Sequence, residues 1–207
     1  MWRLRFGAPI EAWAAVPASH ELERRRSWTR VVGDAVRSRW SADEVDRASQ
    51  TLDDILEGLQ RSRPELALAD LVTWPTRSPL PLRVTFVIAS DVAATDWEAR
   101  GYESSPYLHG PFGEGVQHTR RTPSELDLDV ESVDAVIVFD RGDVALVVRV
   151  HTCPLAMYVA SASNIAALIE TCELSDASGA PFTTGVHEHR ELEASDAWPT
   201  AAGGPHD

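Results

Sequence analysis

The sequence predicts an α+β protein in which an N-terminal helical hairpin is followed by an antiparallel sheet of about five or six strands and a covering C-terminal helix. Two patterns carry this prediction. Residues 19–63 repeat apolar side chains every three or four positions, the period of a helix, whereas residues 133–161 contain Val- and Ile-rich runs separated by turn residues. We expect one domain over residues 1–192, because a chain of 207 residues most often forms a single core.

The helical hairpin, residues 19–63, has the clearest local signals. Its second helix begins with Ser41 and Glu44, which have the spacing of a capping box. The two helices adjoin in the sequence, so they should lie antiparallel and share one apolar seam. We expect Trp28 and Trp40 to anchor this seam, either on the sheet or on another molecule, and one prediction is a homodimer formed through it.

Residues 82–192 should supply the sheet and its covering helix. The helix is expected to begin at Ser163, with Cys172 on its inward stripe, and residues 193–207 have the composition of a disordered acidic tail. Strands are predicted where apolar residues alternate or run together: 2–6, 82–88, 116–121, 126–131, 181–189 and three runs within 133–161.

The segment 133–161 should be the centre of the sheet. Its three runs, separated by Arg141-Gly142-Asp143 and by Pro154, have the pattern of an antiparallel meander. Val136 points to one face of the sheet and Ile137 to the other, so both faces are apolar and both should be covered.

Composition and charge limit the classes of partner. The net charge is −13, and the excess of acids over arginines lies after residue 63, so a phosphate backbone would be repelled. No apolar run approaches the roughly 20 residues that a membrane helix needs. The two cysteines do not define a disulfide framework. We therefore expect a cytoplasmic protein without nucleic-acid or membrane partners.

An acidic ladder forms the first candidate binding surface. Asp127, Asp129 and Glu131 alternate with apolar residues, so their carboxylates should share one face of a strand. A solvated strand face is the simplest interpretation. The other interpretation is a docking surface for a positively charged protein.

The best candidate metal ligands are His151, Cys153, His187 and His189. Alternate residues on a strand face the same way, so these nitrogen and sulfur atoms could converge as a tetrahedral zinc site if the last strand lay beside the meander. The spacing is looser than a paired Cys-x-x-Cys signature. The alternative interpretation is a pair of surface histidines and a buried thiol, with no cofactor.

No motif in the sequence indicates a specific reaction. A Gly-x-Ser-x-Gly elbow is missing, and the Gly-rich residues 110–115 do not open onto a helix as a phosphate loop does. We expect a non-enzymatic protein-binding accessory of the chaperone, immunity or assembly type. The alternatives are a small metal-dependent hydrolase with the His/Cys site, and a small-ligand binder that uses the loop 101–121 against the sheet.

Overall fold

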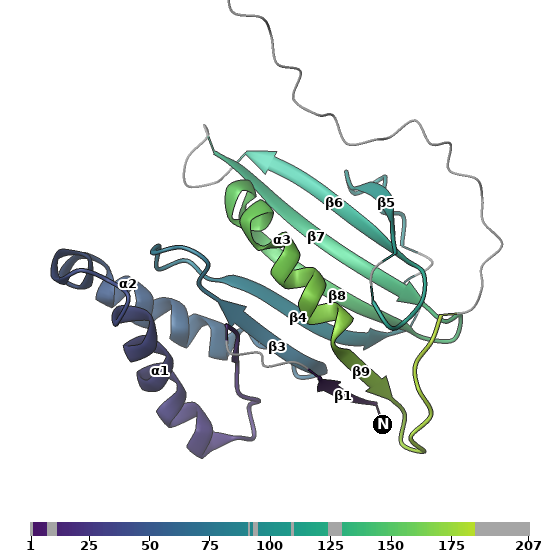
Figure 1. Cartoon of the computed structure of the whole chain (residues 1–207), viewed down its shortest axis with the longest axis horizontal. Helices are drawn as coiled ribbons and strands as arrows, with labels where there is room; N and C mark the ends of the chain where they lie inside the picture. Colours follow the sequence, from purple (N-terminus) through teal and green to yellow (C-terminus); the bar gives the residue numbers. More distant parts are fainter. Residues whose placement is uncertain are drawn as a thin grey trace, which may run out of the picture.

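Seven antiparallel strands form the central sheet of the computed structural model, which describes residues 2–7, 12–90, 92, 95–108, 110–123 and 130–184. The strand order is β2-β3-β4-β8-β7-β6-β5 (Figure 1). The predicted α+β class is confirmed. The sheet has more strands than expected because β2, β3 and β5 were not among the predicted strands, and β2 and β3 precede the range 82–192 in which the sheet was expected. The strands are β2 (Ala14–Ala15), β3 (Ala67–Thr73), β4 (Leu82–Ala89), β5 (Glu103–Tyr107), β6 (Gly115–Pro123), β7 (Glu131–Asp140) and β8 (Ala145–Pro154).

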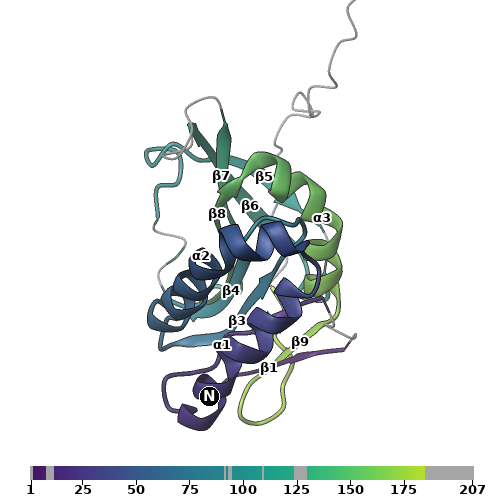
Figure 2. The same ribbon diagram turned by 90° about the vertical axis from the view of Figure 1, so that its left-hand side faces the viewer.

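The two faces of this sheet are covered by different elements. Helix α3 (Leu155–Glu170) lies across β7 and β8, and on the same side β1 (Arg3–Phe6) pairs with β9 (Cys172–Ser175) as a separate two-stranded sheet (Figure 1). Helices α1 (Leu22–Arg37) and α2 (Ala42–Arg61) form the predicted hairpin and lie beside β3 (Figures 1 and 2). We call the two sides of the sheet the α3 face and the hairpin face.

The main core lies between the α3 face and α3. Ile137 and Phe139 of β7 are almost completely buried there, as are Leu146 and Val148 of β8. Val136 points to the hairpin face and packs with Tyr102 in a smaller cluster. The prediction that both faces of the meander strands are covered is therefore confirmed.

The second helix of the hairpin begins as its sequence predicts, whereas the first begins at Leu22, three residues later than expected. The Ser41 hydroxyl accepts from the Glu44 amide, and the Glu44 carboxylate accepts from the Ser41 amide, which completes the capping box. The apolar seam is buried against the edge of the sheet. The buried cluster that the seam forms with this edge contains Val16, Trp28, Val36, Leu52, Leu56, Leu59, Val72 and Trp74.

The prediction of a third meander strand is wrong, because residues 155–161 are the first half of α3. Pro154 occupies the N-cap position, where its missing N–H removes no hydrogen bond within the helix, and the Leu, Ala and Met residues that follow are good helix formers. The helix also ends sooner than expected. Cys172 starts β9 and is not part of the helical stripe.

The β7–β8 connection is a tight hairpin, as predicted. Gly142 supplies its positive φ of 100°, and the Asp140 carboxylate accepts from the Gly142 amide. The predicted strand 126–131, the strand 181–189 and the tail 193–207 lie wholly or largely outside the described residues. None of the helices in the described part of the chain combines the length and the apolar character needed to cross a bilayer.

Candidate functional site

An apolar groove of about 320 Å³ opens on the hairpin edge of the molecule, between α1 and β2. We call it the hairpin groove. Strand β2 is the terminal strand of the described sheet and pairs only with β3. The groove is lined by Ala12, Trp13, Ala14, Val31, Val32, Ala35, Val36, Arg39, Val72 and Trp74.

The exposed large apolar side chain of the lining is Val31 on α1, which is 54% exposed. The guanidinium at its rim belongs to Arg39, whose Nη1 donates to the Trp74 carbonyl at 2.8 Å. That is the one hydrogen bond Arg39 makes through its side chain to the described residues. The rest of the lining is apolar, so the groove suits an apolar side chain with a negative group near Arg39.

Trp28 and Trp40, predicted to bind a partner, are both part of the hairpin's internal cluster. Trp28 is 6% exposed, and the half-buried Trp40 packs against the same buried residues. The seam that they anchor is therefore used within the chain. The homodimer stays a prediction, and it would have to use a surface other than this seam.

Of the three residues of the acidic ladder, the structure describes only Glu131. Glu131, the first residue of β7, is exposed and pairs in register with Pro123 of β6. Asp127 and Asp129 lie outside the described residues. The ladder and its basic partner thus stay a prediction.

A band of polar side chains crosses the hairpin face. We call it the polar strip: Asp70, Arg83, Thr85, His151, Arg149, Asp134, Arg120, Tyr102, His118 and Ser104. One half of it is a buried network on β3, β4 and β8. Arg83 donates from Nε and Nη2 to both oxygens of Asp70, at 2.9 and 2.8 Å, and from Nη1 to the Ser62 hydroxyl at the end of α2.

His151 joins this network through Thr85. The Thr85 hydroxyl donates to Asp70 Oδ1 at 2.9 Å, so it must accept from His151 Nε2, 2.7 Å away, and this assigns the Nε2–H tautomer. Burial, with the nearby charges of Arg83 and Arg149, lowers the pKa of His151 to about 4. In a nucleophile–base–acid triad the imidazole lies between the hydroxyl and the carboxylate. Here the hydroxyl lies between them, so the order gives no activated nucleophile.

The structure does not bring His151 and Cys153 together. Between the pairs Ala135–Val150 and Val133–Cys153, one residue of β7 faces two of β8, which is a β-bulge. Without the extra residue, Cys153 would share the hairpin face with His151. The bulge instead places Cys153 on the α3 face, where it is 5% exposed, while His151 lies on the hairpin face. Burial raises the pKa of the Cys153 thiol to about 11, so it stays protonated.

His187 and His189, the other two predicted zinc ligands, lie outside the described residues. Within the described ranges, no three His, Cys, Asp or Glu side chains are placed to hold a metal ion. The zinc site stays a prediction.

The other half of the polar strip is built around Asp134 on β7. Its Oδ2 accepts from the Tyr102 hydroxyl at 2.6 Å and from Arg149 Nη2 at 3.2 Å, and Arg120 Nη2 lies 3.5 Å away. The Asp134 side chain is 3% exposed, whereas those of Arg120 and Arg149 are 39% and 49% exposed. Tyr102, Arg120, Asp134 and Arg149 are called the Asp134 cluster below.

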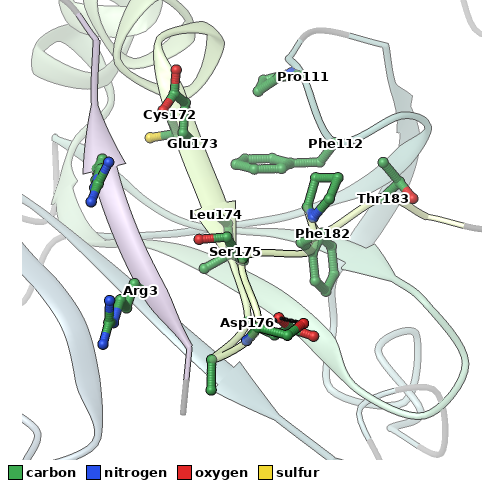
Figure 3. A pocket seen from close by; sticks show the side chains of 15 residues that line it. Arg3, Pro111, Phe112, Cys172, Glu173, Leu174, Ser175, Asp176, Phe182 and Thr183 are labelled. Atoms are coloured by element: carbon green, nitrogen blue, oxygen red, sulfur yellow. Dashed lines mark hydrogen bonds between the residues drawn. The ribbon is translucent and has the colours of Figure 1, made fainter.

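A larger hollow of about 580 Å³ lies beside β1 and β9 (Figure 3). Phe112 and Phe182 border it, but both are at most 2% exposed because they pack in the main core. The Asp176 carboxylate at its rim accepts from the amides of Ser178 and Ala180, so it holds a turn. These side chains are occupied in holding the fold, so the hollow is a weaker candidate than the hairpin groove.

Sequence reasoning missed most of the polar strip. Asp134 and Arg149 each interrupt an apolar strand, and a charge in such a position must find a partner because an unpaired buried charge is costly. That signal pointed to a site but did not identify the partners, which lie on other strands. No family model matches the chain, and no curated protein or solved structure matches it significantly.

Proposed function

We propose that this protein is a non-enzymatic binding protein, and that it holds an extended apolar and acidic segment of a partner protein in the hairpin groove. The observation that supports this proposal is the groove itself: an apolar hollow with an exposed valine, beside the terminal strand of a sheet. Its volume is near the lower limit of small-molecule pockets, roughly 300–1,000 Å³. It therefore suits one anchoring side chain of a longer segment better than an enclosed ligand.

The terminal strand supports an extended partner. An edge strand carries backbone N–H and C=O groups on its outer side, and an added strand can pair with them. Strand β2 contains only Ala14 and Ala15, so such pairing would be short. Most of the affinity must then come from the anchor in the groove and from charge.

Charge determines the kind of partner. Helix α1 carries five arginines and two acids, whereas α2 carries two arginines and six acids. The groove lies along α1, the basic helix, with Arg39 at its rim. A segment with acidic residues beside its apolar anchor fits this border, and a basic one would be repelled.

The experiment is selection from a displayed library of random peptides with the purified protein. We expect enrichment of peptides in which an apolar anchor is flanked by Asp or Glu. Binding of the enriched peptide should be lost in Val31→Glu, which places a negative charge in the groove, and retained in the control Leu66→Glu. Leu66 is 83% exposed and lies outside the groove lining, so both variants add one charge at an exposed apolar site.

Two results would contradict the proposal. One is a selection without a consensus after repeated rounds. The other is a consensus peptide that binds Val31→Glu as tightly as the original protein, because the peptide would then occupy a different surface.

A further inference from the structure

We propose that the Asp134 cluster is a binding site for an oxyanion, namely a phosphate or carboxylate group, held by Arg149 and Arg120. The site lies on the hairpin face and shares no residue with the lining of the hairpin groove. It is therefore independent of the function proposed above.

The cluster has an excess of positive charge. Two guanidinium groups, those of Arg120 and Arg149, face a single carboxylate, that of Asp134. The second ion pair of the polar strip, Arg83 with Asp70, is balanced. A local charge of +1 on a chain with a net charge of −13 is a place to which a small anion is drawn.

Two neighbouring groups that titrate, Tyr102 and His118, do not change this excess. Burial, followed by the hydrogen bond to Asp134, raises the pKa of Tyr102, so its phenol stays neutral and donates to the carboxylate. Burial lowers the pKa of His118, which stacks on Trp97 at 4.5 Å. At neutral pH both groups are therefore uncharged.

The two arginines are held in place but keep donors for a ligand. Arg149 makes one side-chain hydrogen bond to the described residues, and its guanidinium has five N–H donors. Arg120 lies over the Tyr102 ring, with its Cζ 4.8 Å from the ring centroid. Fixing a guanidinium on a carboxylate and an aromatic ring reduces the entropy lost when an anion binds.

The internal network is also incomplete. Asp134 Oδ1 and Arg120 Nε are both buried, and neither has a hydrogen-bond partner in the part of the chain that the structure describes. Of these two atoms only Arg120 Nε carries a donor, which is what an oxyanion accepts from; Asp134 Oδ1 is an acceptor and gives the site no support. Asp134 acts here as a positioning residue: it orients two cations whose outer donors face solvent.

The test is an NMR titration of the whole chain with inorganic phosphate and, separately, with acetate, at an ionic strength held constant with chloride. We expect saturable shifts of the Asp134 and Arg149 amides. Arg149→Ala should weaken binding about tenfold, the loss of one charged hydrogen-bonded contact. Arg149→Lys keeps the charge but not the fork, so its affinity should be intermediate.

The control is Arg61→Ala, which removes one positive charge from an exposed ion pair on α2 and should leave the affinity unchanged. Saturation by phosphate alone identifies a phosphate site, and saturation by acetate alone identifies a carboxylate site. The proposal is overturned if neither anion saturates at matched ionic strength, or if Arg61→Ala weakens binding as much as Arg149→Ala.

Discussion

At the scale of single residues, the polar strip joins the helical hairpin to the sheet. Arg83 on β4 contacts both oxygens of Asp70 on β3 and also the Ser62 hydroxyl and carbonyl, where α2 ends. The Asp70 side chain is completely buried. One guanidinium thus fastens the helical hairpin to the sheet, with every contact charge-assisted.

Removing one partner of the buried Arg83–Asp70 pair should destabilise the fold. Asp70→Ala leaves the Arg83 guanidinium buried without its carboxylate, so we expect the free energy of unfolding to fall by about 3–5 kcal/mol. Urea denaturation measures it. The matched control is Glu57→Ala, which breaks the exposed pair with Arg61 and should cost far less. Equal losses in the two variants would show that the buried pair contributes no more than a surface pair.

His151 should make stability depend on pH. Its pKa in the folded chain is about 4, below its ordinary value of 6.5. Between these values the unfolded chain binds a proton that the folded chain does not, so stability is lost as the pH falls from about 6.5 towards 4. His151→Gln should lose less stability than the original protein between pH 7 and pH 4.5, as measured by urea denaturation.

The control for this prediction is His20→Gln, which removes an exposed histidine. It should follow the pH dependence of the original protein. If His151→Gln shows the same loss of stability with falling pH as the original protein, then His151 titrates normally in the folded state.

At the scale of elements, local signals predicted a helix cap and a strand turn correctly. The capping box of α2 and the Gly142 turn depend on residues a few positions apart, and both were confirmed. The bulge opposite Asp134 could not be predicted, because it arises from the register between two strands. It moved Cys153 to the face opposite His151, which separated two of the expected zinc ligands.

Two glycines test the packing of individual elements. Gly115 of β6 lies against Phe139: an added Cβ would be 2.9 Å from its ring and 3.0 Å from the Val138 carbonyl, so Gly115→Ala should destabilise the fold by roughly 1–3 kcal/mol. Gly58 of α2 has nothing within 4 Å of its added Cβ. Gly58→Ala should therefore stabilise the protein by up to about 1 kcal/mol, because alanine favours a helix. Thermal or urea denaturation of the two variants measures both changes in stability.

Opposite signs for the two variants are the expected result. A neutral Gly115→Ala would mean that the strand and the Phe139 ring can move apart at little cost. A destabilising Gly58→Ala would mean that α2 is packed more closely on that side than the structure shows.

At the scale of the whole molecule, the order of hairpin, sheet and covering helix could be predicted, because the period of apolar residues determines it. Residues 155–161 are the exception, because a short apolar run has a period that fits either a strand or a helix. In the structure they follow Pro154 as the first half of α3. The candidate sites could not be predicted. Thr85 and His151 are 66 residues apart in sequence, and only the pairing of β4 with β8 brings them together.

The central claim is that a partner segment is held along the terminal strand, between α1 and β2. Amide hydrogen exchange with and without the selected acidic peptide tests it most directly. The account predicts slower exchange at Ala14 and Ala15 and near Val31 when the peptide is bound. Protection confined to other strands, or no change at β2 and α1 under saturating peptide, would contradict it.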